Sequence, residues 1–184
     1  LPDYQNRLFL LPVIHSTNDF LKEKLAADGL QQGAVCMAEA QTAGRGRQGR
    51  KWVSPFGCSL YFSMYREFTG GFQAISGLSL AVGLAVVRTL SAFGANNVGL
   101  KWPNDVLLNG GKLAGILLES GPSDTLIIGI GVNLRAAPTQ AEVEEGAVPP
   151  VSLLSETGVD ITPEAFLDLY PLHRMQYSPQ SYHQ

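Results

Sequence analysis

Residues 98–134 constrain the fold most, because they alternate short apolar runs with turn residues. Residues 98–120 read "VGLKWPNDVLLNGGKLAGILLES", and the Asn-Gly-Gly at 109–111 is typical of a tight turn between two antiparallel strands. Residues 125–134, "TLIIGIGVNL", form another apolar run of strand length. A chain with this pattern is expected to build a sheet largely from hairpins and to cover that sheet with other elements.

The rest of the chain predicts further strands and the covering helices. Residues 59–68 alternate side chains with a period of two, which is typical of a strand, and residues 33–40 form a short apolar run. Residues 15–29 predict a helix capped by Ser16 or Thr17. Other helices are expected at residues 72–94, 152–158 and 162–170. The predicted fold class is α/β (α+β), with a mixed, largely antiparallel sheet covered by helices.

Composition narrows the class of protein. The 184 residues fit one domain, and a hydrophobic content of 45% is that of a globular chain. A net charge of -3 argues against a constitutive nucleic-acid binder, and the sequence shows neither a membrane-spanning run nor a signal peptide. The two cysteines, Cys36 and Cys58, lack metal-site spacing, so two free thiols in a cytoplasmic protein are expected rather than one disulfide.

The stretch "GRGRQG" at residues 44–49 matches G-x-G-x-x-G, the pattern of a dinucleotide-binding turn. Such a turn opens a helix whose N-terminus faces the pyrophosphate. Here Pro55 and Gly57 follow instead, and then a strand, so no helix is available. The P-loop pattern and the glycine-rich loop of kinases fail as well, because Lys51 stands where neither pattern permits it. The glycines therefore serve another purpose.

Positive charge is what this stretch offers. Arg45, Arg47, Arg50 and Lys51 are four of the 13 basic residues, gathered in a chain of negative net charge. Arginine binds phosphate and carboxylate with two parallel hydrogen bonds, and Trp52 adds a ring on which a base could stack. We expect a loop that is mobile when empty and is ordered by an anionic ligand. A solvated basic loop and an RNA-binding segment are the alternatives.

A second polar cluster interrupts the apolar strands of residues 98–120. Pro103 ends strand pairing locally, which turns Asn104 and Asp105 out of the sheet. The Asn-Gly-Gly turn then brings Lys112 back along a neighbouring strand. Lysine is seldom buried without an anion, so a binding site is one interpretation. The other is that Lys101 and Lys112 reach the surface and that Asp105 caps a turn.

Together these segments resemble the catalytic domain of biotin protein ligases. The resemblance covers residues 10–170 and is most specific in the GRGRxGR and KWPND motifs. The matching segments are "HSTND" at 15–19, "AEAQTAGRGRQGRKWVSPFG" at 38–57, "LYFSM" at 60–64, "GLSLAVGLAVV" at 77–87, "LKWPNDVLL" at 100–108, "GKLAGILLE" at 111–119 and "IIGIGVNL" at 127–134. It implies a fold like that of class II aminoacyl-tRNA synthetases, shared by biotin and lipoate ligases.

The resemblance implies a reaction in two steps. ATP activates biotin as biotinyl-5'-AMP, and the biotin then passes to a lysine of a biotin carboxyl carrier domain of a carboxylase. Lys112, Arg45 and Arg47 are the implied catalytic residues, and Asp105 is the implied ligand of Mg²⁺. The residues implied to contact biotin are Ser16, Thr17, Asn18, Gln41, Gly44, Arg45, Gly46, Arg47, Lys112, Gly115, Ile116 and Leu117. Those implied to contact ATP or the adenylate are Arg47, Arg50, Lys51, Trp52, Lys101, Asn104, Asp105 and Asn133.

The expected organisation is a catalytic domain at residues 1–170 and an irregular tail at 171–184. No N-terminal helix-turn-helix domain and no C-terminal SH3-like domain are expected within this chain, and no nucleic-acid or membrane partner. A homodimer is compatible with the resemblance. The alternatives left open are a lipoate or octanoate ligase or transferase of the same fold, and a protein that binds biotin without catalysis.

Overall fold

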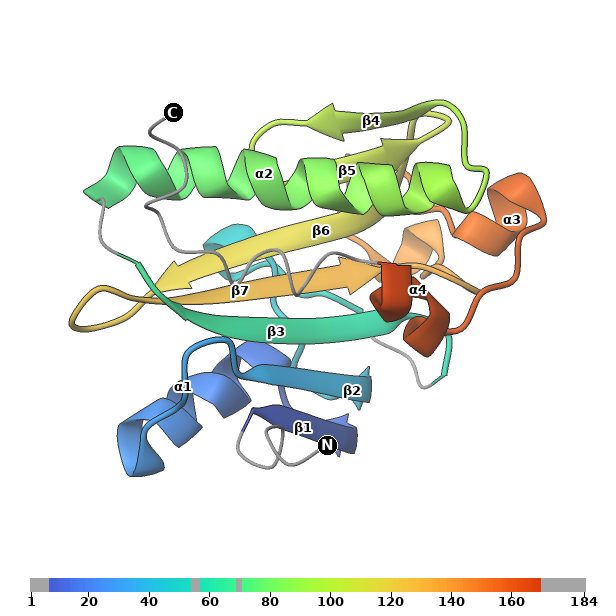
Figure 1. Cartoon of the computed structure of the whole chain (residues 1–184). Helices are drawn as coiled ribbons and strands as arrows, with labels where there is room; N and C mark the ends of the chain where they lie inside the picture. The colour runs from blue at the N-terminus through green and yellow to red at the C-terminus, as the bar shows by residue number, and fades with distance from the viewer. Residues whose placement is uncertain (1–6, 54–56, 69–70, 170–184) are drawn as a thin grey trace.

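The structure is a computed structural model that describes residues 7–53, 57–68 and 71–169. Within these residues, seven strands form one sheet in the order β1-β2-β3-β7-β6-β5-β4 (Figure 1). The strands are β1 (Leu8–Ile14), β2 (Val35–Gln41), β3 (Leu60–Glu67), β4 (Val98–Lys101), β5 (Asp105–Leu108), β6 (Gly111–Ser120) and β7 (Thr125–Val132). The tail expected at 171–184 lies outside the described residues.

The pairing of the strands confirms a mixed, largely antiparallel sheet. β1 pairs with β2 in parallel, and every other neighbouring pair is antiparallel. β5 and β6 form the hairpin predicted around the Asn-Gly-Gly turn, and β4 precedes them as the strand at one edge of the sheet. β1, at the other edge, contains Pro12, which has no N–H to donate and is tolerated where one side of the strand lacks a partner.

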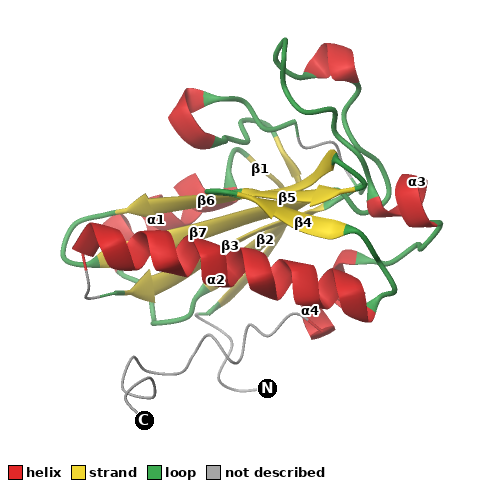
Figure 2. Cartoon of the chain, turned by 90° about the horizontal axis from the view of Figure 1, so that it is seen from above, coloured by secondary structure: helices red, strands yellow, loops and turns green. Residues whose placement is uncertain are grey.

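Helices cover both faces of the sheet. α1 (Thr17–Asp28) begins after Ser16, whose Oγ accepts a hydrogen bond of 3.2 Å from the backbone N–H of Asp19, as an N-cap does. The longer α2 (Gly71–Ala92) crosses β4, β5 and β6 on the opposite face, and Figure 2 shows it along the sheet. The short helices α3 (Leu153–Thr157) and α4 (Pro163–Leu169) follow β7, as predicted.

Two hydrophobic clusters hold these layers together. The larger lies between the sheet and α2, and includes Phe62, Val86 and Ile128. The smaller lies under α1, around Leu21 and Cys36. No helix in the described part of the chain combines the length and hydrophobicity that a membrane span requires. Both cysteines are free thiols, and burial raises the pKa of Cys36 to about 12.

Truncating Phe62 should show how far stability depends on the larger cluster. Phe62 is 1% exposed, so Phe62→Ala is expected to lower the free energy of unfolding by about 3–5 kcal/mol through lost contacts and an unfilled cavity. Urea denaturation followed by circular dichroism measures the change. Leu10→Ala, at a side chain that is 59% exposed on edge strand β1, is the control and should cost less than about 1 kcal/mol. Equal losses in the two variants would contradict this assignment of the core.

A bulge in β6 decides where Lys112 points. Val106 pairs with Ala114 but Leu107 pairs with Lys112, so β6 carries one extra residue at Leu113. Leu113 and Ala114 are therefore both buried in the larger cluster, and the alternation of faces restarts after them. As a result Lys112 lies on the same face as Gly115, which faces away from α2.

Candidate active site

The face of the sheet that α2 leaves uncovered carries a cavity of ≈ 390 Å³. The start of α1, the strands β6 and β7 and two loops form its walls. We call residues 44–52 the arginine loop and residues 135–150 the acidic loop. The side chains and backbone that line the cavity belong to Ser16, Thr17, Asn18, Gln41, Arg45, Gly46, Arg47, Gln48, Arg50, Lys51, Trp52, Val53, Asn104, Asp105, Lys112, Gly115, Ile116, Leu117, Gly129, Ile130, Gly131, Asn133, Pro138, Val143, Glu144, Ala147, Val148 and Pro150.

The arginine loop is a small hairpin rather than the opening of a helix. The backbone N–H of Trp52 donates to the carbonyl of Gly44 at 2.8 Å, and that of Gly46 donates to the carbonyl of Arg50 at 2.7 Å. At the tip, one short 3₁₀ turn spans Arg47–Gly49. The loop joins β2 to β3. The prediction that a strand, and not a helix, follows this stretch is therefore confirmed.

Hydrogen-bonding groups collect at one end of the cavity, where α1 begins. Gln41 Oε1 accepts from the backbone N–H of Thr17 at 2.9 Å and lies 3.2 Å from its Oγ1. Ser63 Oγ lies 2.7 Å from Thr17 Oγ1 and also donates to Asn18 Oδ1. Ser63 and Asn18 are buried, so these polar groups are held in fixed orientations. This end can bind a compact polar ring.

The indole of Trp52 lies on the floor of the cavity, against two glycines that face each other across β6 and β7. Gly115 and Gly131 are cross-strand partners. A Cβ atom at Gly131 would come within 2.8–3.0 Å of three indole atoms, and one at Gly115 within 2.9 Å of the ring. The absence of side chains at both positions therefore lets the ring lie close to the sheet, where it forms an apolar surface beside Leu117.

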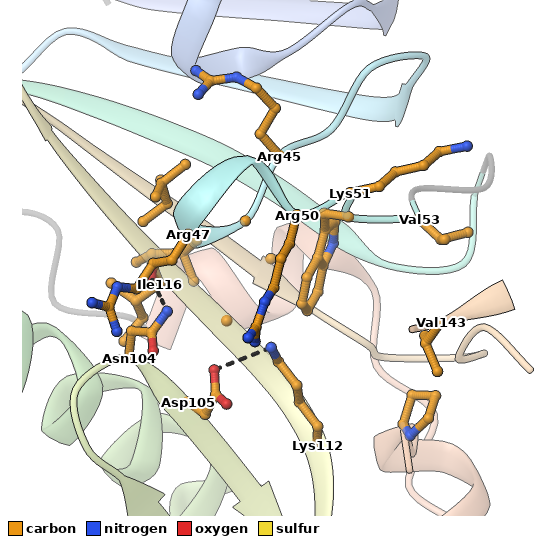
Figure 3. A pocket seen from close by; sticks show the side chains of 18 of the residues that line it. Arg45, Arg47, Arg50, Lys51, Val53, Asn104, Asp105, Lys112, Ile116 and Val143 are labelled. Carbon is orange, nitrogen blue, oxygen red and sulfur yellow. Dashed lines mark hydrogen bonds and ion pairs between the residues drawn. The ribbon is translucent and has the colours of Figure 1, made fainter. Parts of the chain in front are cut away.

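The opposite end of the cavity carries a lysine–carboxylate pair. Lys112 Nζ lies 3.1 Å from Asp105 Oδ1 and 5.1 Å from the centre of the Trp52 ring (Figure 3). Beside them, Asn104 is fixed by Ile116, since its Nδ2 donates to the carbonyl of Ile116 at 3.2 Å. The sequence predicted that the turn would bring Lys112 back to this cluster, and the structure places it there.

The acidic loop closes one side of the cavity. Glu144 Oε2 lies 3.5 Å from Arg50 Nε, so the two loops meet in an exposed ion pair. At its end the acidic loop pairs with β6, because the backbone N–H of Lys112 donates to the carbonyl of Pro149 at 2.8 Å. An anion entering between the loops would compete with Glu144 for Arg50.

Arg45 binds carboxylates of the protein itself. Its Nη2 lies 2.6 Å from Asp19 Oδ1 and 2.8 Å from Glu119 Oε1, and in Figure 3 it points away from the pair of Lys112 and Asp105. These bonds, chiefly that to Glu119, raise the pKa of Arg45. Burial alone would raise the pKa of Glu119, but hydrogen bonds from Arg45, Lys22 and Asn18 outweigh it and lower that pKa to about 2.

The depressed pKa of Glu119 has a consequence for stability in acid. A carboxyl with a lowered folded-state pKa stabilises the protein above its ordinary pKa of 4.5, and this contribution is lost as the pH falls towards about 2. Glu119→Gln has no such group. The difference in unfolding free energy between wild type and this variant should therefore shrink by at most about 3 kcal/mol between these pH values. Urea denaturation at a series of pH values measures it, and a constant difference would contradict the assignment.

Most of the residues expected at the site meet in this cavity, and two do not line it. All the residues expected to contact biotin line the cavity except Gly44, which is buried at the base of the arginine loop. The ones expected to contact ATP line it apart from Lys101, whose exposed side chain lies at the end of β4. Lys51 lines the cavity but in Figure 3 its side chain extends away from Lys112.

Sequence reasoning missed three parts of the site. The glycines at 129 and 131 were assigned only to a buried strand, although glycine inside a strand signals a close approach. For the acidic loop no role in the site was expected. Glu119 was overlooked, although it shares a face of β6 with Gly115 and Leu117 at a spacing of two residues.

Comparison with known proteins gives this geometry a context. The sequence pattern of the biotin/lipoate A/B protein ligase family matches residues 10–133. The biotin--[acetyl-CoA-carboxylase] ligase of Paracoccus denitrificans is 50% identical over 149 residues, which are 78% of this chain and 62% of that protein. The bifunctional ligase/repressor BirA of Escherichia coli is 43% identical over 157 residues, which are 83% of this chain and 47% of that protein. The chain thus spans about half to two thirds of the length of these relatives.

A solved structure agrees with the sequence comparison. The biotin protein ligase of Aquifex aeolicus in complex with biotin and ATP superposes with a TM-score of 0.73 at 35% identity, covering 92% of this chain and 68% of that one. The fold predicted from the motifs is therefore confirmed. The match to the family pattern runs from β1 to Asn133. It therefore includes the arginine loop, Lys112 and the two glycines, Gly115 and Gly131, against which Trp52 lies. The chain belongs to the biotin/lipoate A/B protein ligase family.

Proposed function

We propose that this chain activates biotin with ATP, forming biotinyl-5'-AMP, and transfers the biotin to a lysine of a carboxyl carrier domain. One observation carries the proposal: a single cavity joins a rigid polar end, an apolar floor and a cationic end. Biotin has the same three parts in the same order, namely a ureido ring, a hydrocarbon tail and a carboxylate. The names of the relatives, biotin--[acetyl-CoA-carboxylase] ligase and biotin protein ligase, support this choice of substrate.

The polar end is suited to the ureido ring because its groups are already oriented. Thr17 is held by Gln41, and Asn18 is held by Ser63, so little ordering is required when a ligand binds. The hydrocarbon tail would then lie along Trp52 and Leu117, and the carboxylate would reach Lys112. A mostly apolar site with a few placed polar groups is the usual design for such a ligand.

The first step needs positive charge where two anions meet. A carboxylate oxygen of biotin attacks the α-phosphorus of ATP, an O–P bond forms, and the bond to the β-phosphate breaks with release of pyrophosphate. The Lys112 ammonium stabilises the negative charge that develops on the attacked phosphate. Arg47 and Arg50, on the arginine loop at the same cavity, neutralise the phosphates that leave.

Mg²⁺ is part of this proposal, with Asp105 as its protein ligand. The described residues contain no group of three or more His, Cys, Asp or Glu side chains that could hold a metal by themselves. One carboxylate next to a phosphate-binding cavity does fit Mg²⁺, because this ion usually takes one or two protein carboxylates together with phosphate oxygens. When bound with ATP, the ion would neutralise charge on the phosphates.

The second step requires an acceptor lysine at the same cavity. The amine of the carrier's lysine attacks the carbonyl of the mixed anhydride, an amide bond forms, and AMP leaves with its negative charge while the amine loses a proton. The adenylate reacts readily with water, so the arginine loop and the acidic loop have to cover it until the acceptor arrives.

Exchange of radioactive pyrophosphate into ATP, with biotin and Mg²⁺ but no acceptor, tests the first step. Exchange that depends on biotin is the expected result. Exchange with lipoate in place of biotin would assign the chain to the lipoate ligases of the same family. If neither acid supports exchange while biotin still binds in calorimetry, the chain binds biotin without activating it, and the proposal fails.

Trp52 gives a direct signal of ligand binding. Its ring lies on the floor of the cavity, whereas the other tryptophan, Trp102, is 72% exposed and does not line it. Adding biotin is expected to change the intrinsic fluorescence of the wild type and of Trp102→Phe equally. The fluorescence of Trp52→Phe should not change when biotin is added. A signal that disappears with Trp102 instead would place the ligand elsewhere.

A further inference from the structure

Glu119 is a charged side chain that the proposed chemistry leaves without a role. It lies on β6 next to the cavity but does not line it, and its side chain is 19% exposed. Both carboxylate oxygens are bonded twice. Oε1 accepts from Asn18 at 2.9 Å and from Arg45 at 2.8 Å, while Oε2 accepts from Lys22 at 2.5 Å and from Arg45 at 3.1 Å. Charged groups that share hydrogen bonds in a network of this kind contribute more to stability than an isolated exposed ion pair does.

On one side this carboxylate fixes the polar end of the cavity. Asn18 Nδ2 donates to Glu119, and Asn18 Oδ1 accepts from Ser63. With both ends of its amide bonded, Asn18 has one orientation, and the amide lies so close to β7 that a Cβ atom at Gly129 would come within 2.3 Å of it. Glu119 therefore acts on a ligand indirectly, by fixing Asn18, which lines the cavity.

On the other side the same carboxylate holds the base of the arginine loop. Arg45 forms a β-bridge with Lys51, so fixing Arg45 fixes where both arms of the hairpin begin. Asp19 shares the guanidinium, with Arg45 Nη2 2.6 Å from its Oδ1. Two carboxylates therefore balance the charges of Arg45 and Lys22. Arg45 could not turn to a phosphate without leaving both of its ion pairs, which favours an anchoring role over a phosphate contact.

We propose that Glu119 is a positioning residue that ties the arginine loop to the polar end of the cavity, so that one carboxylate holds both the group that meets the biotin ring and the loop that covers its carboxylate. The part of this inference that concerns biotin rests on the proposed function. The anchoring of the loop does not, and it can be measured on the free protein.

Two variants and a control test the anchor. Glu119→Gln keeps the shape and an acceptor oxygen but loses the charge, and Arg45→Gln releases the loop from the other side. Glu23→Gln, an exposed carboxylate on α1, is the matched control. In Glu119→Gln we expect trypsin to cleave after Arg47, Arg50 and Lys51 several-fold faster than in the wild type without any ligand. We also expect the KM for biotin in pyrophosphate exchange to rise about tenfold and the KM for ATP to rise less. The variant loses the support of Asn18 at the polar end as well as the support of the loop that carries Arg47 and Arg50.

The double variant separates positioning from general stability. If Glu119 acts through Arg45, Glu119→Gln with Arg45→Gln should raise the biotin KM no more than the larger single effect. Unchanged cleavage in Glu119→Gln would overturn the anchor, and a parallel rise of both KM values with a lowered Tm would reduce Glu119 to a stabilising residue. If the wild type supports no exchange, the proposed function fails, while the cleavage rates still decide whether Glu119 anchors the loop.

Discussion

Lys112→Ala is expected to lower the rate of biotin-dependent pyrophosphate exchange by about 10²–10³-fold, because removing a charged group from the point where charge develops has an effect of this size. The effect should appear in kcat. Binding of biotin, measured by calorimetry, should weaken by less than about tenfold, since the polar end and the Trp52 floor remain. The substitution also leaves the Asp105 carboxylate without the ammonium that lies 3.1 Å from it.

Lys24→Ala is the matched control for this loss of a lysine. Lys24 forms an i,i+4 pair with Asp28 on the outside of α1 and does not line the cavity. Its removal should leave exchange unchanged within a factor of about two. Retention of more than about a tenth of wild-type exchange in Lys112→Ala would show that another group stabilises the transition state.

Gly129→Ala is expected to raise the KM for biotin by about 10–100-fold through a single added methyl group. A Cβ atom there would lie 2.3 Å from Oδ1, 2.9 Å from Cγ and 3.0 Å from Nδ2 of Asn18. Asn18 is held by Ser63 and Glu119, so it cannot yield without losing those hydrogen bonds. The KM for ATP should change far less, because the cationic end lies elsewhere in the cavity.

Gly77→Ala on α2 is the matched control, because it adds the same methyl group at a position where no described residue is close. Among the described residues, no atom lies within 4 Å of a Cβ atom at Gly77, and the residue is within a helix. This variant should keep wild-type kinetics and gain about 0.5–1 kcal/mol of stability from the helix propensity of alanine. If Gly129→Ala binds biotin normally, Asn18 is not part of the biotin site.

How much the sequence predicts depends on whether a position obeys local rules. The helix after Ser16 and the hairpin at the Asn-Gly-Gly turn follow from capping and turn chemistry, and both are present. The face of β6 on which Lys112 lies does not follow from local rules. Strict alternation along β6 would place it opposite to Gly115, and only the bulge at Leu113 returns it to the same face. A bulge depends on pairing with β5, which no single segment encodes.

The site was predicted more completely for its charges than for its surroundings. Arginines and lysines among glycines are conspicuous in a sequence. Of the basic residues expected at the site, all but Lys101 line the cavity. The partners of Arg45 are not conspicuous. Glu119 lies 74 residues away, and its spacing from Gly115 and Leu117 on β6 does not show which cation it binds. Long-range ion pairs of this kind are set by how α1 packs on the sheet.

The attachment of the acidic loop bears on how such a protein can acquire new substrates. Main-chain hydrogen bonds fix the loop at both ends. The backbone N–H of Arg135 donates to the carbonyl of Cys58, that of Lys112 donates to the carbonyl of Pro149, and that of Val151 donates to the carbonyl of Lys112. Residues between these attachments can be replaced or lengthened without moving the lysine. Substitutions in the loop are therefore expected to change which molecules enter the cavity, while Lys112 keeps its position. Libraries that randomise residues 139–147 would test whether this loop selects the ligand while Lys112 keeps its place in the cavity.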